Sequence, residues 1–128
     1  MARILYIEDD PNLTQLLGEI FLPSKGFRVE IAHDGLEGVE KARRWRQDLI
    51  LLDLLLPQLD GLTVMKTLKQ DLATQDIPVI AITALPTRQN RQLVEAAGGR
   101  AFVPKPFHPN DLLNLIRQNL PQPELVHS

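Results

Sequence analysis

Five short apolar runs alternate along this chain with amphipathic segments, and this alternation constrains the fold more than any other feature. The apolar runs span residues 3–7, 27–32, 48–53, 77–82 and 101–103, and the segments with helical periodicity span residues 12–22, 35–45, 62–70, 88–97 and 110–119. Strict alternation favours a parallel sheet covered by helices on both faces, with right-handed crossovers. We therefore expect a single doubly wound, flavodoxin-like α/β domain of five βα units, with the strand order 2-1-3-4-5.

A proline lies just beyond the first helical segment. Because α conformation is disfavoured in the residue before a proline, Pro23 predicts that this helix ends at Leu22 or is distorted there. The apolar residues at helical spacing in this segment are Leu13, Leu16, Leu17, Ile20 and Phe21. In the second helical segment, Leu36, Val39 and Ala42 are expected to face the core.

Length and composition restrict the chain further. Its 128 residues suit one domain, and 44% hydrophobic with 23% charged residues is typical of a globular protein. We assign residues 1–120 to that domain and residues 121–128 to a tail or the start of a linker. The absence of cysteine excludes disulfides, thiolate catalysis and zinc–thiolate sites, and it fits a reducing cytoplasm.

Neither a membrane nor a nucleic acid is an expected partner. No stretch approaches the roughly 20 apolar residues of a membrane span, and the N-terminus runs into the first strand without a signal-peptide pattern. The formal net charge of −2 favours neither DNA nor an anionic surface. The basic run of Lys41, Arg43, Arg44 and Arg46 around Trp45 is interpreted as a solvated helix face. We expect a cytoplasmic protein.

Acidic residues end two of the predicted strands. Glu8, Asp9 and Asp10 close the first strand, and Asp53 closes the third. In the order 2-1-3-4-5 the switch point lies between strands one and three, and ligands bind there at the carboxyl edge. Crowded carboxylates at that edge favour a hard divalent cation with oxygen ligands. Asp10 differs from the others, because Asp10-Pro11 is a good helix entry and predicts an N-cap.

Five side chains are expected to converge at the carboxyl edge of the sheet, namely Glu8, Asp9, Asp53, Thr83 and Lys105. Each of them ends or follows a predicted strand. Lys105 supplies an ammonium that can meet a phosphoryl oxygen, and Thr83 supplies a small hydroxyl. A nucleophilic carboxylate, a metal, a cation and a donor are the parts that phosphoryl transfer needs.

On these residues, the chain resembles the response-regulator receiver domain of two-component signalling, from Arg3 to about Leu120. Five segments carry the resemblance in order: Ile4-Leu5-Tyr6-Ile7-Glu8-Asp9-Asp10, Asp48-Leu49-Ile50-Leu51-Leu52-Asp53, Leu56-Pro57 with Asp60-Gly61, Ile82-Thr83-Ala84, and Lys105-Pro106-Phe107. Each segment alone is a weak signal, whereas all five in this order and at these separations are highly specific.

The resemblance implies a role for each acid. Asp53 corresponds to the acceptor that takes a phosphoryl group from a partner kinase's phosphohistidine. Asp9 corresponds to the main metal carboxylate, and Glu8 to a second acid that acts through a metal-bound water. The backbone carbonyl of Leu55 corresponds to a further ligand, and the metal would be Mg²⁺ or Mn²⁺.

The resemblance also implies a conformational switch. Thr83 corresponds to the switch hydroxyl that moves toward the phosphoryl group, and Phe102 to the switch aromatic that turns inward afterwards. Lys105 corresponds to the family's lysine, whose bond to Pro106 is cis in the family. The output would be read on the fourth helix, the fifth strand and the fifth helix. Phe102 lacks the phenol of a tyrosine, and a plain core role is the alternative for it.

The implied partners are a sensor histidine kinase or a phosphotransfer protein, and a downstream protein or output domain that the sequence does not identify. The domain would promote only its own phosphorylation and dephosphorylation, so it would not be a turnover enzyme. We expect a monomer or a weak, phosphorylation-dependent dimer. The first helix often docks kinases in the family, so the distortion at Pro23 bears on partner choice.

Rival functions leave sequence signals that can be compared. An aspartyl-phosphate phosphatase would want a second acid two residues after the nucleophile, where Leu55 stands. A flavodoxin-like cofactor binder would need a loop rich in Ser, Thr and Gly after the first strand, and no dinucleotide glycine pattern is present. A degenerate receiver that binds partners constitutively, without phosphorylation, is the remaining alternative, and the complete set of acids, Thr83 and Lys105 argues against it.

Overall fold

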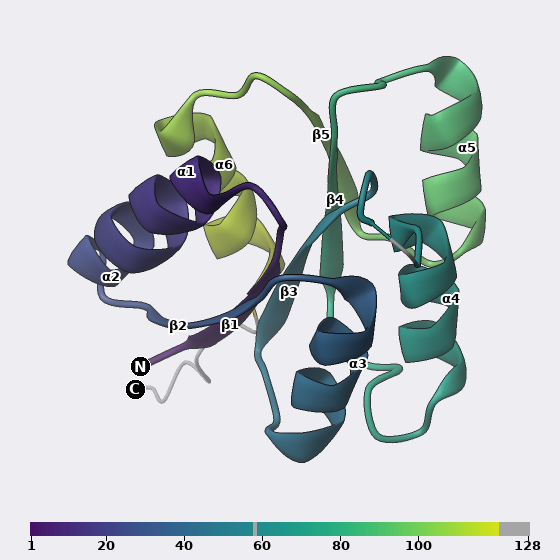
Figure 1. Cartoon of the computed structure of the whole chain (residues 1–128), viewed down its shortest axis with the longest axis horizontal. Helices are drawn as coiled ribbons and strands as arrows, with labels where there is room; N and C mark the ends of the chain where they lie inside the picture. The colour runs from purple at the N-terminus through teal and green to yellow at the C-terminus, as the bar shows by residue number, and fades with distance from the viewer. Residues whose placement is uncertain (58, 121–128) are drawn as a thin grey trace, which may run out of the picture.

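Five parallel strands form one sheet in the computed structural model, which describes residues 1–57 and 59–120 (Figure 1). The strands are β1 (Arg3–Ile7), β2 (Arg28–Ala32), β3 (Leu49–Asp53), β4 (Val79–Thr83) and β5 (Ala101–Pro104). Their order in the sheet is β2-β1-β3-β4-β5, as predicted from the alternation of strands and helices. The predicted tail, residues 121–128, lies outside the described residues.

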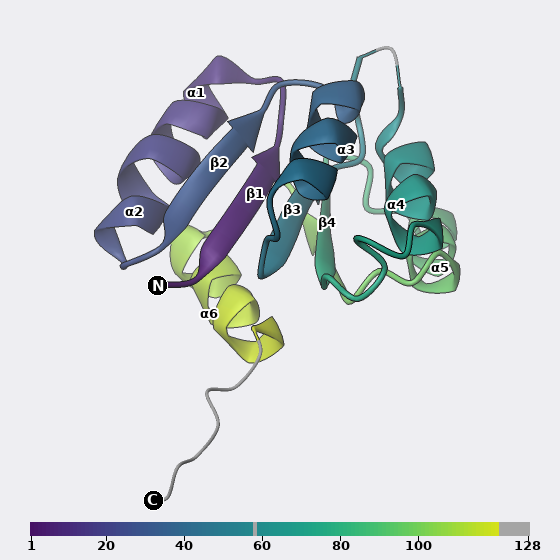
Figure 2. The ribbon, with the colours of Figure 1, turned by 90° about the horizontal axis from the view of Figure 1, so that it is seen from below.

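Helices cover both faces of this sheet. They are α1 (Pro11–Leu13), η1 (Thr14–Phe21), α2 (Leu22–Ser24), α3 (Gly35–Arg44), α4 (Gly61–Gln70), α5 (Arg88–Ala96) and α6 (Pro109–Asn119). Figure 2 shows the continuous α1–η1–α2 helix and α6 on one side, with α3, α4 and α5 on the other. Within the described part of the chain, no helix is long and apolar enough to cross a membrane.

The alternation of side chains along each strand divides the interior into two cores. On β1, Leu5 and Ile7 point into the core beneath α3, α4 and α5, whereas Ile4 and Tyr6 point into the core beneath η1 and α6. Every residue of β3 and β4 is buried, which explains why these strands read as unbroken apolar runs. The central strands are therefore held on both faces, and their carboxyl ends are rigid supports for a site.

Side-chain caps set the start of each helix on the site side of the sheet. Asp10, Asp34, Asp60 and Thr87 each accept a hydrogen bond from a backbone N–H in the first turn that follows. His108 caps α6 in the same way through its Nδ1. These bonds satisfy N–H groups that would otherwise lack partners. The N-cap predicted at Asp10 is confirmed.

The first helix does not end at Leu22 but continues past Pro23 to Ser24. Its central part, η1, is a π-helix, and the Leu22 N–H donates to the Leu17 carbonyl five residues earlier. Pro23 is the second residue of α2, inside the continuous helix, and it cannot donate the backbone hydrogen bond that other residues make there. The predicted alternative of a distortion is what the chain adopts, because a wider turn accommodates the proline and the helix can continue.

One apolar residue of α3 faces differently from the prediction. Leu36 is 64% exposed, although Val39 and Ala42 of the same helix are buried as expected. The reason is Gly38, where a Cβ would lie 2.5 Å from Ile7 Cδ1, so α3 packs closely through this glycine and turns Leu36 outward. On η1, Leu16 and Ile20 are exposed while Leu17 is buried.

Gly61 begins α4 against the loop that follows β3. A Cβ at this position would lie 2.4 Å from Leu54 Cα and 2.5 Å from the Asp53 carbonyl oxygen. Alanine normally stabilises a helix by roughly 0.5–1 kcal/mol over glycine, but these contacts are backbone atoms, and overpacking costs about 1–3 kcal/mol.

We therefore expect Gly61→Ala to lower the free energy of unfolding by about 1–2 kcal/mol in urea denaturation. Lys66→Ala, on the exposed face of the same helix, is the control and should change it by less than about 0.5 kcal/mol. A more stable Gly61→Ala protein would contradict the close approach of α4 to this loop.

Candidate functional site

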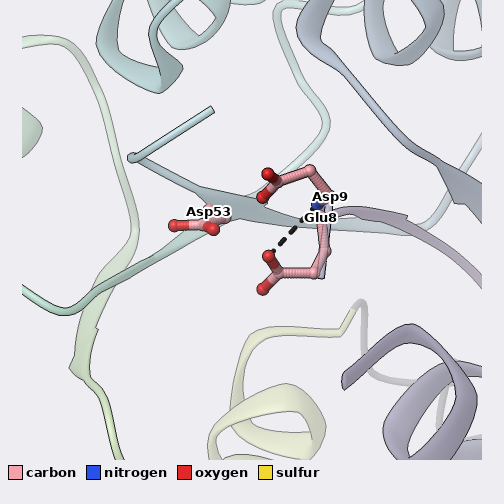
Figure 3. A group of neighbouring side chains, drawn as sticks. All are labelled: Glu8, Asp9 and Asp53. Atoms are coloured by element: carbon pink, nitrogen blue, oxygen red, sulfur yellow. Dashed lines mark hydrogen bonds between the residues drawn. The ribbon is translucent and has the colours of Figure 1, made fainter. Parts of the chain in front are cut away.

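Three carboxylates gather where β1 and β3 end. Glu8 and Asp9 follow β1, and Asp53 is the last residue of β3 (Figure 3). One carboxylate oxygen from each of the three lies within 4.8 Å of the others. Glu8 and Asp53 are buried, whereas Asp9 is exposed. The sheet order thus brings together the acids that the sequence placed at the switch point.

Lys105 joins two of these acids from the other end of the chain. Its Nζ lies 2.8 Å from Glu8 Oε1 and 3.2 Å from Asp53 Oδ2. Lys105 follows β5, and its backbone N–H donates to the carbonyl of Thr83 at the end of β4. The Lys105–Pro106 peptide bond is cis, in agreement with the expectation from the family resemblance.

Burial and crowding set the electrostatics of the site. Removal from water and the neighbouring Asp53 carboxylate raise the pKa of Glu8 to about 7, although the Lys105 ammonium acts in the opposite direction. Burial alone would lower the pKa of Lys105, but the hydrogen bond and charge of Glu8, with the charge of Asp53, outweigh it and raise that pKa. Lys105 therefore remains a cation facing the acids.

Asp53 is oriented by hydrogen bonds to both of its oxygens. The backbone N–H of Leu55 donates to Oδ1 at 3.0 Å, and Lys105 donates to Oδ2. The Leu55 side chain, two residues after Asp53, is about half exposed. Thr83, at the end of the neighbouring strand β4, is buried, and its Oγ1 accepts a hydrogen bond from the Leu85 N–H at 3.0 Å. The hydroxyl proton of Thr83 is therefore available to another acceptor.

Phe102 lies on β5, partly buried against the core beneath α3, α4 and α5. The guanidinium carbon of Arg91, on α5, is 4.9 Å from the centre of its ring. At this distance a cation–π contact contributes about 0.5–1 kcal/mol on a partly exposed surface. Sequence reasoning missed Arg91, because nothing in the spacing of α5 and β5 identifies which side chains meet.

Tyr6 is a second residue that sequence reasoning missed. Its hydroxyl donates to Glu8 Oε1 at 3.3 Å inside the protein. Side chains two residues apart in extended chain point to the same face, and Tyr6 is the polar-tipped residue of the run Ile4–Ile7, two residues before Glu8. That alternation was the signal that could have linked it to Glu8.

The donor set suits a hard divalent cation. Glu8, Asp9 and Asp53 offer only oxygen atoms, which are the ligands that Mg²⁺ prefers. Among the residues that the structure describes, none donates a hydrogen bond to the Asp9 carboxylate, which is also exposed to solvent. Asp9 is thus the acid whose oxygens are least committed to the protein.

Comparison with known families identifies the class of protein. A family model described as the response regulator receiver domain matches residues 4–117, which is most of the chain. This chain therefore belongs to the response regulator receiver domains of two-component systems. As a receiver domain, it is not an enzyme of the classical, multiple-turnover kind.

Individual relatives agree with this assignment. The DNA-binding dual master transcriptional regulator RpaA of Synechocystis is 40% identical over 117 residues, which are 91% of this chain and 48% of RpaA. The chain thus spans about half the length of that relative, and only 33% of the transcriptional activator PfeR of Pseudomonas aeruginosa, to which it is 42% identical over 105 residues.

Solved structures have the same fold. The chemotaxis protein CheY4 of Vibrio cholerae is 28% identical with a TM-score of 0.88, covering 94% of this chain and 99% of CheY4. The receiver domain of the sensor histidine kinase PA1611 from Pseudomonas aeruginosa is 33% identical with a TM-score of 0.83, covering 92% of this chain and 96% of that domain. A magnesium ion is coordinated in the active site cleft of PA1611.

A divalent cation bound by the acid cluster should raise the stability of the folded protein. A ligand that binds only the folded state stabilises it by about 2.7 kcal/mol when present at 100 times its Kd. We expect Mg²⁺ to stabilise the wild-type protein in thermal unfolding relative to a chelator, and Asp9→Asn to lose this gain. Without metal, Asp9→Asn should be at least as stable as the wild type, because one of three crowded charges is removed.

Asp10→Asn is the matched control for this experiment. It removes the same charge one residue away, and asparagine is as good an N-cap as aspartate. The Asp10→Asn protein should still be stabilised by Mg²⁺ in thermal unfolding. If both variants lost the stabilisation by Mg²⁺ equally, the metal would be bound by general negative charge and not by the acid cluster.

Proposed function

We propose that this chain is the phosphoacceptor receiver of a two-component phosphorelay, in which Asp53 takes a phosphoryl group from the phosphohistidine of a sensor histidine kinase or a phosphotransfer protein. The observation that carries the proposal is the position of the Asp53 carboxylate. It is buried at a strand end, beside two further acids and within 3.2 Å of the Lys105 ammonium. Family membership supports the same reaction.

In the proposed transfer, Asp53 is the nucleophile. One of its carboxylate oxygens forms a bond to phosphorus as the nitrogen–phosphorus bond of the phosphohistidine breaks. The electron pair of the broken bond stays on the imidazole nitrogen, and a proton on the other ring nitrogen leaves the departing imidazole neutral. The product on this chain is an acyl phosphate, and a hydrolytic water later returns Asp53 to a carboxylate.

Charge is the obstacle that the site must overcome. An anionic phosphoryl group has to approach Glu8, Asp9 and Asp53, so electrostatic stabilisation dominates this chemistry. A Mg²⁺ or Mn²⁺ ion beside these three acids, with Asp9, Asp53 and the backbone carbonyl of Leu55 as its ligands, would supply compensating positive charge. Lys105 supplies the rest, because its ammonium faces the acceptor and can bind a phosphoryl oxygen.

We further propose that Thr83 and Phe102 convert phosphorylation into a change of shape. The Thr83 hydroxyl is free to donate to a phosphoryl oxygen, since its present contact uses it as an acceptor from Leu85. Movement of Thr83 and its loop would open space for Phe102 to turn inward. That turn would break the contact with Arg91 and alter the face formed by α5, β5 and α6.

The kinase or phosphotransfer protein is proposed to dock beside the acceptor, along the first helix. A groove of about 440 Å³ runs there between η1 and the loop that follows β5, and its lining includes Leu13, Leu16, Phe21, Lys105 and Phe107. This lining is mainly apolar, and it explains why Leu16 can face solvent in the free domain. Lys105 belongs to both the groove and the site, so a docked partner lies next to Asp53.

The output partner is proposed to be a protein or a further domain rather than nucleic acid contacted by this receiver. The formal net charge of −2 does not favour binding to duplex DNA. RpaA is described as DNA-binding, but less than half of it matches this chain. The alternative function is a degenerate receiver that binds its partner constitutively, and the intact cluster of acids with Lys105 weighs against it.

The proposed function predicts a metal-dependent covalent modification. After incubation with Mg²⁺ and a small-molecule phosphodonor, the intact protein should gain the mass of a single phosphate. The gain should be absent in Asp53→Asn and in the presence of a chelator. If the folded wild-type protein gains no mass, the degenerate receiver becomes the better description and constitutive binding would have to be sought.

Oligomeric state offers a separate test. Because we propose that the face of α5, β5 and α6 changes only on phosphorylation, the unmodified protein should sediment as a monomer. A phosphoryl mimic should leave it monomeric or produce a weak dimer whose dissociation constant is accessible by sedimentation equilibrium. A tight dimer of the unmodified protein would contradict this part of the proposal.

A further inference from the structure

Tyr6 is the only tyrosine of the chain, and it is completely buried in β1. Its ring lies in the core beneath η1 and α6, among aliphatic and aromatic side chains that offer no hydrogen-bond partner. Its hydroxyl reaches Glu8 Oε1 at 3.3 Å. A buried hydroxyl without a partner costs about 1–3 kcal/mol, and phenylalanine would fill the same volume without that risk. The tyrosine is therefore explained by its bond to Glu8.

Glu8 is saturated by protein donors. Oε1 accepts from the Tyr6 hydroxyl at 3.3 Å and from Lys105 Nζ at 2.8 Å. Oε2 accepts from the backbone N–H groups of Asp9 at 3.2 Å and Asp10 at 3.3 Å. An ionised carboxylate has about four lone-pair sites, so these four donors occupy its full capacity. Glu8 is thereby held inward, in one orientation.

A glycine on η1 allows this helix to pack closely against the Tyr6 ring. A Cβ on Gly18 of η1 would lie 3.3 Å from Tyr6 Cδ2 and 2.9 Å from Ile31 Cδ1. Any side chain at this position would press on the tyrosine ring or on Ile31. The close passage of η1 thus confines the tyrosine ring whose hydroxyl reaches Glu8.

We propose that Tyr6 is a positioning residue for the metal site, whose hydroxyl holds the Glu8 carboxylate in its inward orientation and thereby leaves direct coordination of the divalent cation to Asp9 and Asp53. Glu8 then acts on the cation through its negative charge, which it shares with Lys105, and not as a direct ligand. This inference rests on the proposed function, because it concerns the same cation.

The test is the affinity for Mg²⁺ alone, measured by titration calorimetry on the whole chain. Outer-sphere hydrogen bonds typically contribute 10–100-fold to metal affinity, so Tyr6→Phe should weaken Mg²⁺ binding by about 10-fold. Thr74→Val is the matched control, since Thr74 is also buried and its hydroxyl donates to the Leu68 carbonyl, outside the acid cluster. The control should bind Mg²⁺ like the wild type.

A spectroscopic signal distinguishes positioning from a purely structural role. In a Trp45→Phe background Tyr6 is the main ultraviolet chromophore, and Mg²⁺ should produce a tyrosine difference spectrum whose midpoint matches the calorimetric Kd. Glu8→Gln should abolish this spectral change, because the charged acceptor of the phenol is lost. Thermal unfolding of each variant confirms that the protein is folded.

The outcomes separate this inference from the proposed function. The role of Tyr6 is overturned, and the receiver function stands, if the wild type binds Mg²⁺ and folded Tyr6→Phe binds it equally well. The same conclusion follows if the tyrosine spectrum of the Trp45→Phe protein does not change when Mg²⁺ binds. If the folded wild type binds no Mg²⁺ and takes no phosphate, the proposed function fails, and the role of Tyr6 fails with it.

Discussion

The Lys105 ammonium, placed between Glu8 and Asp53, is the interaction on which the rest of the site depends. Two buried carboxylates this close repel each other, and a cation at 2.8 and 3.2 Å offsets that repulsion. Lys105 also joins the ends of β1, β3 and β5, because its contacts span 97 and 52 residues of sequence. The same cation that offsets this repulsion is the one proposed to bind an incoming phosphoryl group, so the stability of the site and its proposed function depend on one side chain.

The two cores serve different parts of the proposed function. The core beneath η1 and α6 contains Tyr6 and supports the acid pair and the apolar groove proposed for the phosphodonor. The core beneath α3, α4 and α5 supports Phe102, which is proposed to report phosphorylation. β3 and β4 separate these cores and are buried throughout, and the proposed switch acts through Asp53 and Thr83 at the ends of these two strands.

Local sequence signals predicted the elements well and their orientation less well. The five strands, the switch point and the N-cap at Asp10 follow from apolar runs, strand ends and capping chemistry. The exposure of Leu36 could not be foreseen, because it results from the approach of Gly38 to Ile7 across the fold. The continuation of the helix past Pro23 likewise depends on a π-helical turn that local propensity does not encode.

By itself, the sequence determined the βα alternation and the residue types at each strand end, because both are set by short-range periodicity and by the chemistry of single side chains. The parallel order then required Glu8, Asp9 and Asp53 to meet at one edge. The convergence of Lys105 with these acids was predicted, but only the tertiary structure decided that its ammonium contacts both Glu8 and Asp53 and that Tyr6 donates to Glu8. Such contacts depend on ångström-scale packing between distant segments, which no pattern along a chain specifies.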